Sequence, residues 1–458
     1  MSYFLKAVLI LCASVLAGLV VGTVGVRSAL IIPGVVAVIV LGALILTKPY
    51  IGLVATMAAL PLESLYSDLP GGTSVLSIIG LITITAYLVG NRFAIRSRTG
   101  FSLVYRFAIA FVAWLFLSNP TAAMGSRNWL FTYIQLLILM WLSAEELTPK
   151  RQRHLMLIFI GITIVPAILA LDQARLSSTI YRSTRALGLV ENANIFAMYL
   201  NIGIAFTLYF IVSSHLSRIA RLAMVGVMIL LMLAVVLSIS RSGAIAFGTM
   251  MVFSIIFYNK LAAVQTEIER RKNLYNLAFI IIVILAAALI VIPPQYWSIL
   301  EETRQVVAQG AEADRGTFGV RLELWQESLQ LWRTSPITGI GIGRFFVASG
   351  HVVHNMYLQV LSELGIVGFT FLVGWLGAIV YNLLHTMYRS DNKELVSLAA
   401  SWMLMLIAIC VMGLSGSWQL YSKALWLLAG VSTVFIAQQQ SVAKSEVVQQ
   451  PQLVATNT

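Results

Sequence analysis

The sequence predicts an all-α fold: a polytopic bundle of about 12–14 transmembrane helices with one larger loop subdomain on its outer side. Of the 458 residues, 59% are hydrophobic and 10% are charged, whereas charged residues make up about 25% of a soluble domain. The mean hydropathy is +0.90. The apolar residues form long runs, and about 20 such residues cross a ~30 Å hydrocarbon core as a helix. Composition therefore excludes a soluble enzyme, a disordered chain and a disulfide-rich secreted domain.

About fourteen apolar segments are candidates to cross the membrane. In chain order they are 7–25, 29–47, 50–62, 74–90, 102–118, 128–143, 155–171, 194–213, 222–240, 243–258, 273–292, 363–388, 396–414 and 423–437. The first resembles the apolar part of a signal peptide but has no clear cleavage site, so we expect it to be retained. The segment 50–62 is short and interrupted by Pro61, and the sequence leaves open whether it crosses fully or re-enters.

Basic residues predict the orientation of the helices. Short loops rich in lysine and arginine face the cytoplasm, and a cytoplasmic N-terminus places every basic cluster on that side. The clusters are Arg92/Arg96/Arg98, Lys150/Arg151/Arg153, Arg218/Arg221, Lys260/Arg270/Arg271/Lys272 and Arg389/Lys393. Both termini are then cytoplasmic, and the net charge of +12 needs no nucleic-acid partner.

Two outer segments, 172–193 and 293–354, contain arginine but no lysine. Their arginines are Arg175, Arg182, Arg185, Arg304, Arg315, Arg321, Arg333 and Arg344. A guanidinium group binds phosphate or carboxylate through two parallel hydrogen bonds, which an ammonium group cannot do. This pattern favours an anionic ligand on the outer side. The alternative is that the arginines pair with acidic residues of the same loop, which are Glu301, Glu302, Glu312, Asp314, Glu323 and Glu327.

The predicted organisation has four parts: helices 1–11 over 1–292, the outer loop 293–354, C-terminal helices over 355–438, and a disordered cytoplasmic tail over 439–458. Within the loop, the segment 319–332 repeats apolar residues at helical spacing and predicts an amphipathic helix against the membrane surface or the bundle. Pro336 ends it. Gly339, Gly341 and Gly343 then permit tight turns or close approach to a ligand.

His354 is the first candidate for chemistry. It lies where the outer loop meets the next helix, and an imidazole there suits a general base near neutral pH. A capping or packing role is the alternative. The spacing of His351 and His354 also resembles a metal pair, but no third ligand or carboxylate cluster accompanies them.

Arg241, Asn192 and Asn194 form a second group of candidates. Arg241 stands at the outer end of a long apolar span. A cation there either faces a cavity with an anionic partner or snorkels to the interface. Asn192 and Asn194 precede or begin a helix. Asn194 is either an N-cap, or the amides bind sugar hydroxyls or phosphate at the helix N-terminus.

In this order, the motifs resemble the O-antigen ligase and polymerase superfamily. They are Ser-Arg-Ser-Gly at Ser240–Gly243, Arg-Leu-x-Leu-Trp at Arg321–Trp325, a proline- and glycine-containing loop at Pro336–Phe345, and the run His354–Phe369. The resemblance covers roughly Glu191–Phe369 and is strongest after Gly319.

The resemblance implies a GT-C-like, lipid-carrier-dependent glycosyltransferase of the bacterial inner membrane, inverting and independent of metal or another cofactor. Its donor is a glycan on undecaprenyl pyrophosphate, and its acceptor is lipid A–core or another glycan at the periplasmic face. Arg241 and Arg321 match residues that hold the donor pyrophosphate, and His354 matches the residue that activates the acceptor hydroxyl. Possible substrate contacts are Asn192, Asn194, Asn355, Tyr357, Gly341 and Gly343.

Ligases and polymerases share these motifs, so the sequence leaves open which reaction occurs, which sugars move and what the oligomeric state is. We take ligation as the first expectation and polymerisation as the alternative. A transporter of the same lipid-linked glycan is a weaker alternative, because it predicts paired repeats and charges at the membrane midplane.

Overall fold

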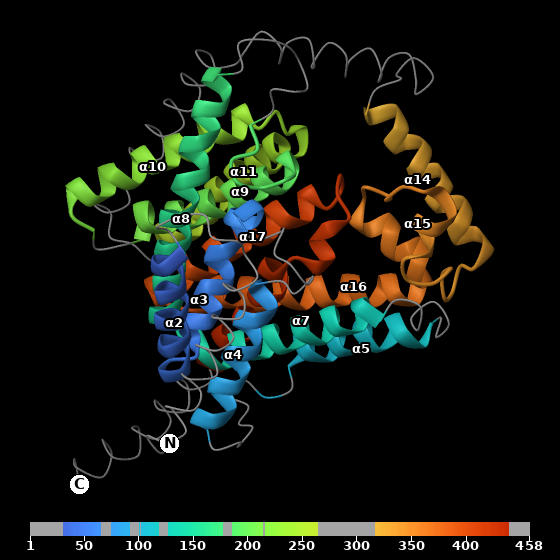
Figure 1. Cartoon of the computed structure of the whole chain (residues 1–458), viewed down its shortest axis with the longest axis horizontal. Helices are drawn as coiled ribbons and strands as arrows, with labels where there is room; N and C mark the ends of the chain where they lie inside the picture. Colours follow the sequence, from blue (N-terminus) through green and yellow to red (C-terminus); the bar gives the residue numbers. More distant parts are fainter. Residues whose placement is uncertain are drawn as a thin grey trace.

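The computed structural model describes residues 31–65, 75–91, 100, 102–118, 127–176, 186–213, 216–263 and 317–438. Helices make up these ranges, with turns between them and no strand within them (Figure 1). The predicted all-α class is confirmed. The predicted spans 7–25 and 273–292, the tail and residues 293–316 of the outer loop lie outside the described residues. The boundary proposed at residue 292 therefore remains a prediction.

The N-terminal helices are α2 (Ile31–Thr47), α3 (Tyr50–Ala59), α4 (Val75–Gly90), α5 (Leu103–Leu117) and α7 (Arg127–Glu146). Each coincides with a predicted span except α3, which has 10 residues and rises only about 15 Å. A 3-10 helix, η1 (Leu60–Leu65), follows, and Leu62 leaves helical geometry there. Since Pro61 interrupts the chain at this point, the segment 50–62 does not form one continuous α-helix across a membrane.

The middle of the chain forms α8 (Pro149–Leu176), α9 (Ala193–Ser213), α10 (Arg218–Leu237) and α11 (Arg241–Ala263). Helix α9 lies at their centre and packs against α8, α10, α11 and α17. Edge-to-face aromatic contacts run from Phe159 to Phe206 and on to Trp402 of α17. These contacts place α9 and α17 in the core of the molecule.

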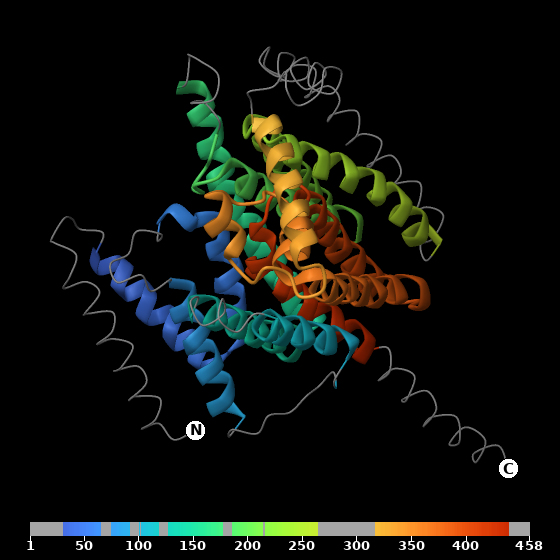
Figure 2. The same cartoon turned by 90° about the vertical axis from the view of Figure 1, so that its right-hand side faces the viewer.

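The C-terminal part contains α14 (Thr317–Thr334), α15 (Arg344–Ser349), α16 (Met356–Arg389), α17 (Lys393–Met412) and η3 (Trp418–Tyr421). A final helix, Lys423–Gln438, follows. The amphipathic helix predicted at 319–332 is confirmed as α14, which packs against α16 and α15. In Figure 1, α14 and α15 lie together beside α16, and Figure 2 shows α14 crossing in front of the C-terminal helices.

Five of the described helices are long and apolar enough to cross a membrane: α8, α9, α10, α16 and α17. Shorter apolar helices accompany them, as expected for a multi-pass membrane protein. Helix α16 begins before the predicted span 363–388. It kinks at Gly365, whose φ is 66°, so its first turns form a separate arm that leads to the candidate site.

Candidate functional site

His354 lies in the short connection between α15 and α16. Its backbone has φ 54°, in the left-handed region that residues other than glycine rarely adopt. Asn355 follows as the N-cap of α16, and its side-chain oxygen accepts the N–H groups of Tyr357 at 3.0 Å and Leu358 at 3.1 Å. The helix thus begins after both His351 and His354, so the two histidines do not share a helical face.

The structure brings Arg321 and His354 together. Burial lowers the pKa of His354 below 6.5, and the positive charges of Arg321 and then His351 lower it further. A lowered pKa keeps the imidazole neutral at pH 7, the form that accepts a proton. Two residues on either side of the proline- and glycine-containing loop therefore interact electrostatically, and the imidazole is kept neutral.

A small buried cluster holds this pair in place. It consists of Leu324 on α14, Phe345 on α15 and Val353, the residue before His354. Ser328 of α14 also donates its hydroxyl to the carbonyl of Leu358 at 3.1 Å. Together these contacts fix α14, which carries Arg321, against the start of α16.

The proline- and glycine-containing loop at Pro336–Phe345, the docking loop, packs on the kink of α16. The N–H groups of Ile340 and Gly341 donate to the carbonyls of Ser362 at 3.0 Å and Glu363 at 2.9 Å. A Cβ on Gly339, whose φ is 73°, would lie 2.3 Å from the carbonyl of Glu363. Because the kink frees carbonyls of α16, the loop replaces part of that helix's own hydrogen bonding.

The predicted ligand contacts in this region have structural partners. Gly341 gives its N–H to α16, and Gly343 is the left-handed N-cap of α15. The Asn355 side-chain oxygen caps α16, and the Tyr357 hydroxyl donates to the carbonyl of Cys410 at 2.9 Å. These observations explain why such residues stand here, and substrate contact by them remains a prediction.

Arg241, Asn192 and Asn194 meet at a second place in the fold. Asn192, not Asn194, caps α9, because its side-chain oxygen accepts the N–H of Asn194 at 2.8 Å. The hydroxyl of Ser240 donates to Asn194 Oδ1 at 2.7 Å and accepts the N–H of Gly243 at 3.1 Å. Arg241, the first residue of α11, is thus anchored beside the N-terminus of α9.

These contacts join Arg241 to α9, whereas Arg321 and His354 are held by α14, α15 and α16. Helix α17 packs against α9, α11 and α16 and so connects the two groups. Of the other outer arginines, Arg333 and Arg344 are exposed. Arg182, Arg185, Arg304 and Arg315 lie outside the described residues, as does the side chain of Arg175.

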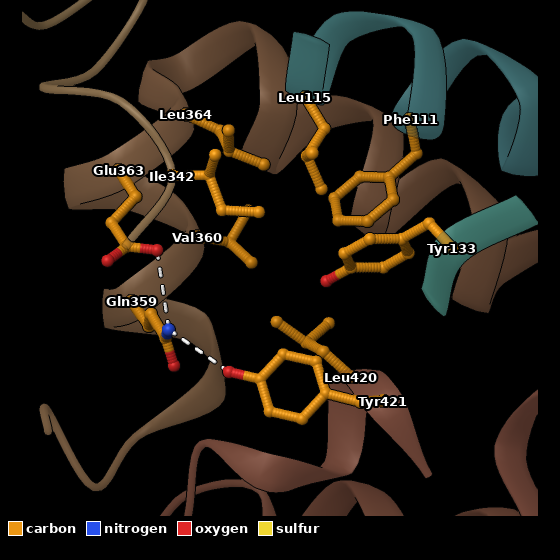
Figure 3. Close-up of a pocket in the computed structure, with 10 residues that line it drawn as sticks. All are labelled: Phe111, Leu115, Tyr133, Ile342, Gln359, Val360, Glu363, Leu364, Leu420 and Tyr421. Carbon is orange, nitrogen blue, oxygen red and sulfur yellow. Dashed lines mark hydrogen bonds between the residues drawn. The ribbon is translucent and has the colours of Figure 1, made fainter. Parts of the chain in front are cut away.

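Sequence reasoning missed a buried polar group beside the docking loop. Glu363 is 4% exposed and lines a small cavity with Gln359, Tyr421 and Tyr133 (Figure 3). The signal was present in the sequence, since an acidic residue at the first position of a predicted span is unusual and calls for a partner.

No group of three His, Cys, Asp or Glu side chains that could hold a metal occurs in the described ranges. Those ranges therefore give no support to the alternative of a metal pair at His351 and His354.

Comparison with known proteins agrees with the motifs. The family model described as O-Antigen ligase matches residues 226–373, which include Arg241, Arg321 and His354. Asn192 and Asn194 precede the match. No curated protein shows significant similarity to the chain.

Proposed function

We propose, from the match of residues 226–373 to the O-antigen ligase family model, that the protein is a membrane glycosyltransferase of cell-surface polysaccharide biosynthesis. It transfers a glycan from undecaprenyl pyrophosphate to an acceptor hydroxyl at the periplasmic face of the bacterial inner membrane. The observation that carries this proposal is the buried cluster of Leu324, Phe345 and Val353, which holds the segments of Arg321 and His354 together within the matched residues. The lowered pKa of His354 agrees with it.

In the proposed reaction, neutral His354 removes the proton of the acceptor hydroxyl as its oxygen attacks the anomeric carbon. A sugar hydroxyl is a weak nucleophile, and a base within about 3 Å assists its attack. The new glycosidic bond forms while the bond from the anomeric carbon to the pyrophosphate oxygen breaks. Attack from the opposite side inverts the anomeric centre.

The leaving group is a pyrophosphate, so negative charge grows on its oxygen as the bond breaks. Arg321 is suited to neutralise this charge from the side of His354. We assign Arg241 to the same pyrophosphate, because the N-terminus of α11 adds a partial positive charge that favours a bound anion. Fixed cations of this kind stabilise the transition state without a metal ion, and EDTA should leave transfer unchanged.

Ligation onto lipid A–core is the first candidate reaction, and polymerisation of glycan repeats by the same residues is the second. Both use the same donor and base and differ in the acceptor. Transport of the lipid-linked glycan is less favoured, since it gives no role to a neutral imidazole beside Arg321.

The test is the surface polysaccharide of a deletion strain complemented with wild-type, His354→Ala or His351→Ala genes. His351 is exposed and serves as the matched control. We expect wild type and His351→Ala to restore the polysaccharide and His354→Ala to fail at equal protein levels. Long chains left on the carrier lipid indicate a ligase, and single repeats on the acceptor indicate a polymerase. Restoration by His354→Ala would remove the base assignment, and an unchanged profile in the deletion strain would contradict transferase function.

A further inference from the structure

Glu363 of α16 is buried against the docking loop. It has no assigned role beside Arg321 and His354. Its carboxylate faces hydrogen-bond donors. Glu363 Oε1 accepts the backbone N–H of Phe345 at 3.3 Å, and Oε2 accepts the Nε2 amide of Gln359 at 3.3 Å. The N–H of Gly343 faces the same carboxylate. A buried acid is costly unless such donors satisfy it, so this arrangement calls for side-chain oxygen acceptors at position 363.

The amide of Gln359 extends this chain of hydrogen bonds. Its Nε2 atom also donates to the hydroxyl of Tyr421 in η3 at 3.3 Å, as Figure 3 shows. The Oε1 atom of Gln359 is buried and has no hydrogen-bond partner among the described residues. The network therefore joins three separate elements, which are the docking loop, α16 and η3.

Glu363 holds the docking loop twice. Its side chain binds the N–H of Phe345, and its own carbonyl accepts the N–H of Gly341 at 2.9 Å. The side-chain contact fixes the first turns of α15 relative to α16. Removing the carboxylate would leave the N–H of Phe345 buried without a partner, which would loosen this turn.

Phe345 transmits this anchoring to the candidate site. Its ring is 1% exposed and packs in the cluster with Leu324 and Val353. Leu324 lies one helical turn after Arg321, and Val353 directly precedes His354. A displacement of Phe345 therefore moves the two segments that carry the proposed cation and the proposed base.

We propose that Glu363 is a positioning residue that sets the geometry of Arg321 and His354 through the backbone of Phe345. The inference rests on the proposed function in assigning roles to Arg321 and His354. The effect of Glu363 on the surroundings of His354 does not depend on those roles and can be measured without an activity assay.

Three variants of the full-length protein test the proposal. Glu363→Ala removes both acceptor oxygens. Glu363→Gln keeps one oxygen for Phe345, and rotation of the Gln359 amide lets its free Oε1 accept the new N–H₂ group. Glu394→Ala is the matched control, because Glu394 is a partly exposed acid of α17 that pairs with Arg153 at 3.3 Å. If Glu363→Ala fails to accumulate in the membrane, Glu363→Asp replaces it, since its shorter side chain cannot reach Phe345.

The first measurement is transfer by the purified protein in lipid nanodiscs. A displacement of about 1 Å at a catalytic group reduces turnover by about 100-fold, so we expect kcat to fall between about 10- and 100-fold in Glu363→Ala. Glu363→Gln should retain most of the turnover, and Glu394→Ala should match wild type. Wild-type kcat in Glu363→Ala would overturn the proposal.

The second measurement is the NMR titration of the His354 imidazole in the same proteins, assigned with a His354→Asn variant. Loosening the cluster exposes His354 to water and releases it from Arg321, so its pKa should rise towards 6.5 in Glu363→Ala. Loss of the carboxylate charge alone would lower that pKa, so the direction separates the two causes. An unchanged or lower His354 pKa in Glu363→Ala would overturn the proposal. Failure of wild-type transfer would instead contradict the proposed function, leaving this titration informative.

Discussion

The Ser240 hydroxyl donates to Asn194 Oδ1 at 2.7 Å, and this bond joins the N-termini of α11 and α9. The same hydroxyl caps α11 by accepting the N–H of Gly243. A Cβ on Gly243 would lie 2.5 Å from the Cβ of Ala197, so the two helices approach closely here. The Ser-Arg-Ser-Gly motif thus fixes the backbone on both sides of Arg241.

Ser240→Ala should destabilise the protein and reduce transfer. It removes an N-cap, which costs about 1 kcal/mol, and deletes the hydrogen bond to Asn194 Oδ1. The midpoint of thermal unfolding in detergent, measured beside activity, checks this. Ser254→Ala in the same helix is the control, because the hydroxyl of Ser254 bonds only locally to the carbonyl of Met251. Equal behaviour of the two variants would mean that the link between α9 and α11 contributes little.

Arg321→Lys should lose almost as much transfer as Arg321→Ala. A lysine keeps the charge but cannot form two parallel hydrogen bonds to a pyrophosphate. The measurement is kcat/KM for a lipid-linked donor, with Arg333→Lys as the control at an exposed position. Full activity of Arg321→Lys would show that the position requires charge alone.

The acid limb of the pH–rate profile should lie below pH 6.5. Burial, Arg321 and His351 all lower the pKa of His354, so the imidazole stays neutral down to that lower pKa and transfer falls only beneath it. His351→Gln removes one of the positive charges that lower the pKa of His354. It should therefore shift the acid limb of kcat/KM to higher pH while leaving the plateau unchanged. A limb at or above pH 6.5 in the wild-type protein would contradict His354 as the base.

Gly339→Ala and Gly350→Ala form a matched pair for the docking loop. Both glycines are left-handed, with φ 73° and 72°. A Cβ on Gly350 meets none of the described residues within 4 Å, whereas one on Gly339 meets the backbone of Glu363 at 2.3 Å. Gly350→Ala should cost about 1 kcal/mol from backbone strain alone. Gly339→Ala should cost clearly more and also reduce transfer, as unfolding and activity measurements would show. Similar losses in the two variants would mean that the loop shifts at Gly339 to accommodate the added Cβ.

Much of the fold could be predicted because apolar runs report directly on buried or membrane-facing helices. The helix at 319–332 could be placed from its spacing alone, and α17 lies within two or three residues of its predicted ends. The start of α16 near His354 was also expected, but its kink at Gly365 could not be predicted, because the backbone groups freed there find their partners in another segment of the chain. The interruption after Ala59 was visible at Pro61, although the sequence left its consequence open.

The site was less accessible to sequence reasoning. The motif spacing put Arg321 and His354 forward, and the structure brings them together. Asn192 takes the capping role that the sequence offered to Asn194, since capping depends on where α9 begins, within one residue. Glu363 stood out only as an acid at the start of a predicted span. Two of its donors are the backbone N–H groups of Gly343 and Phe345, and backbone partners leave no trace in residue type.

The left-handed backbone of His354 has a consequence for how the protein tolerates change. Holding a residue other than glycine in this conformation costs about 1–2 kcal/mol, so the chain sacrifices folding stability to present an imidazole at this point. His354→Gly should therefore unfold at a higher temperature than the wild-type protein while losing transfer. Stability and activity oppose each other at this position, and a selection for heat resistance alone would remove the residue on which catalysis is proposed to depend.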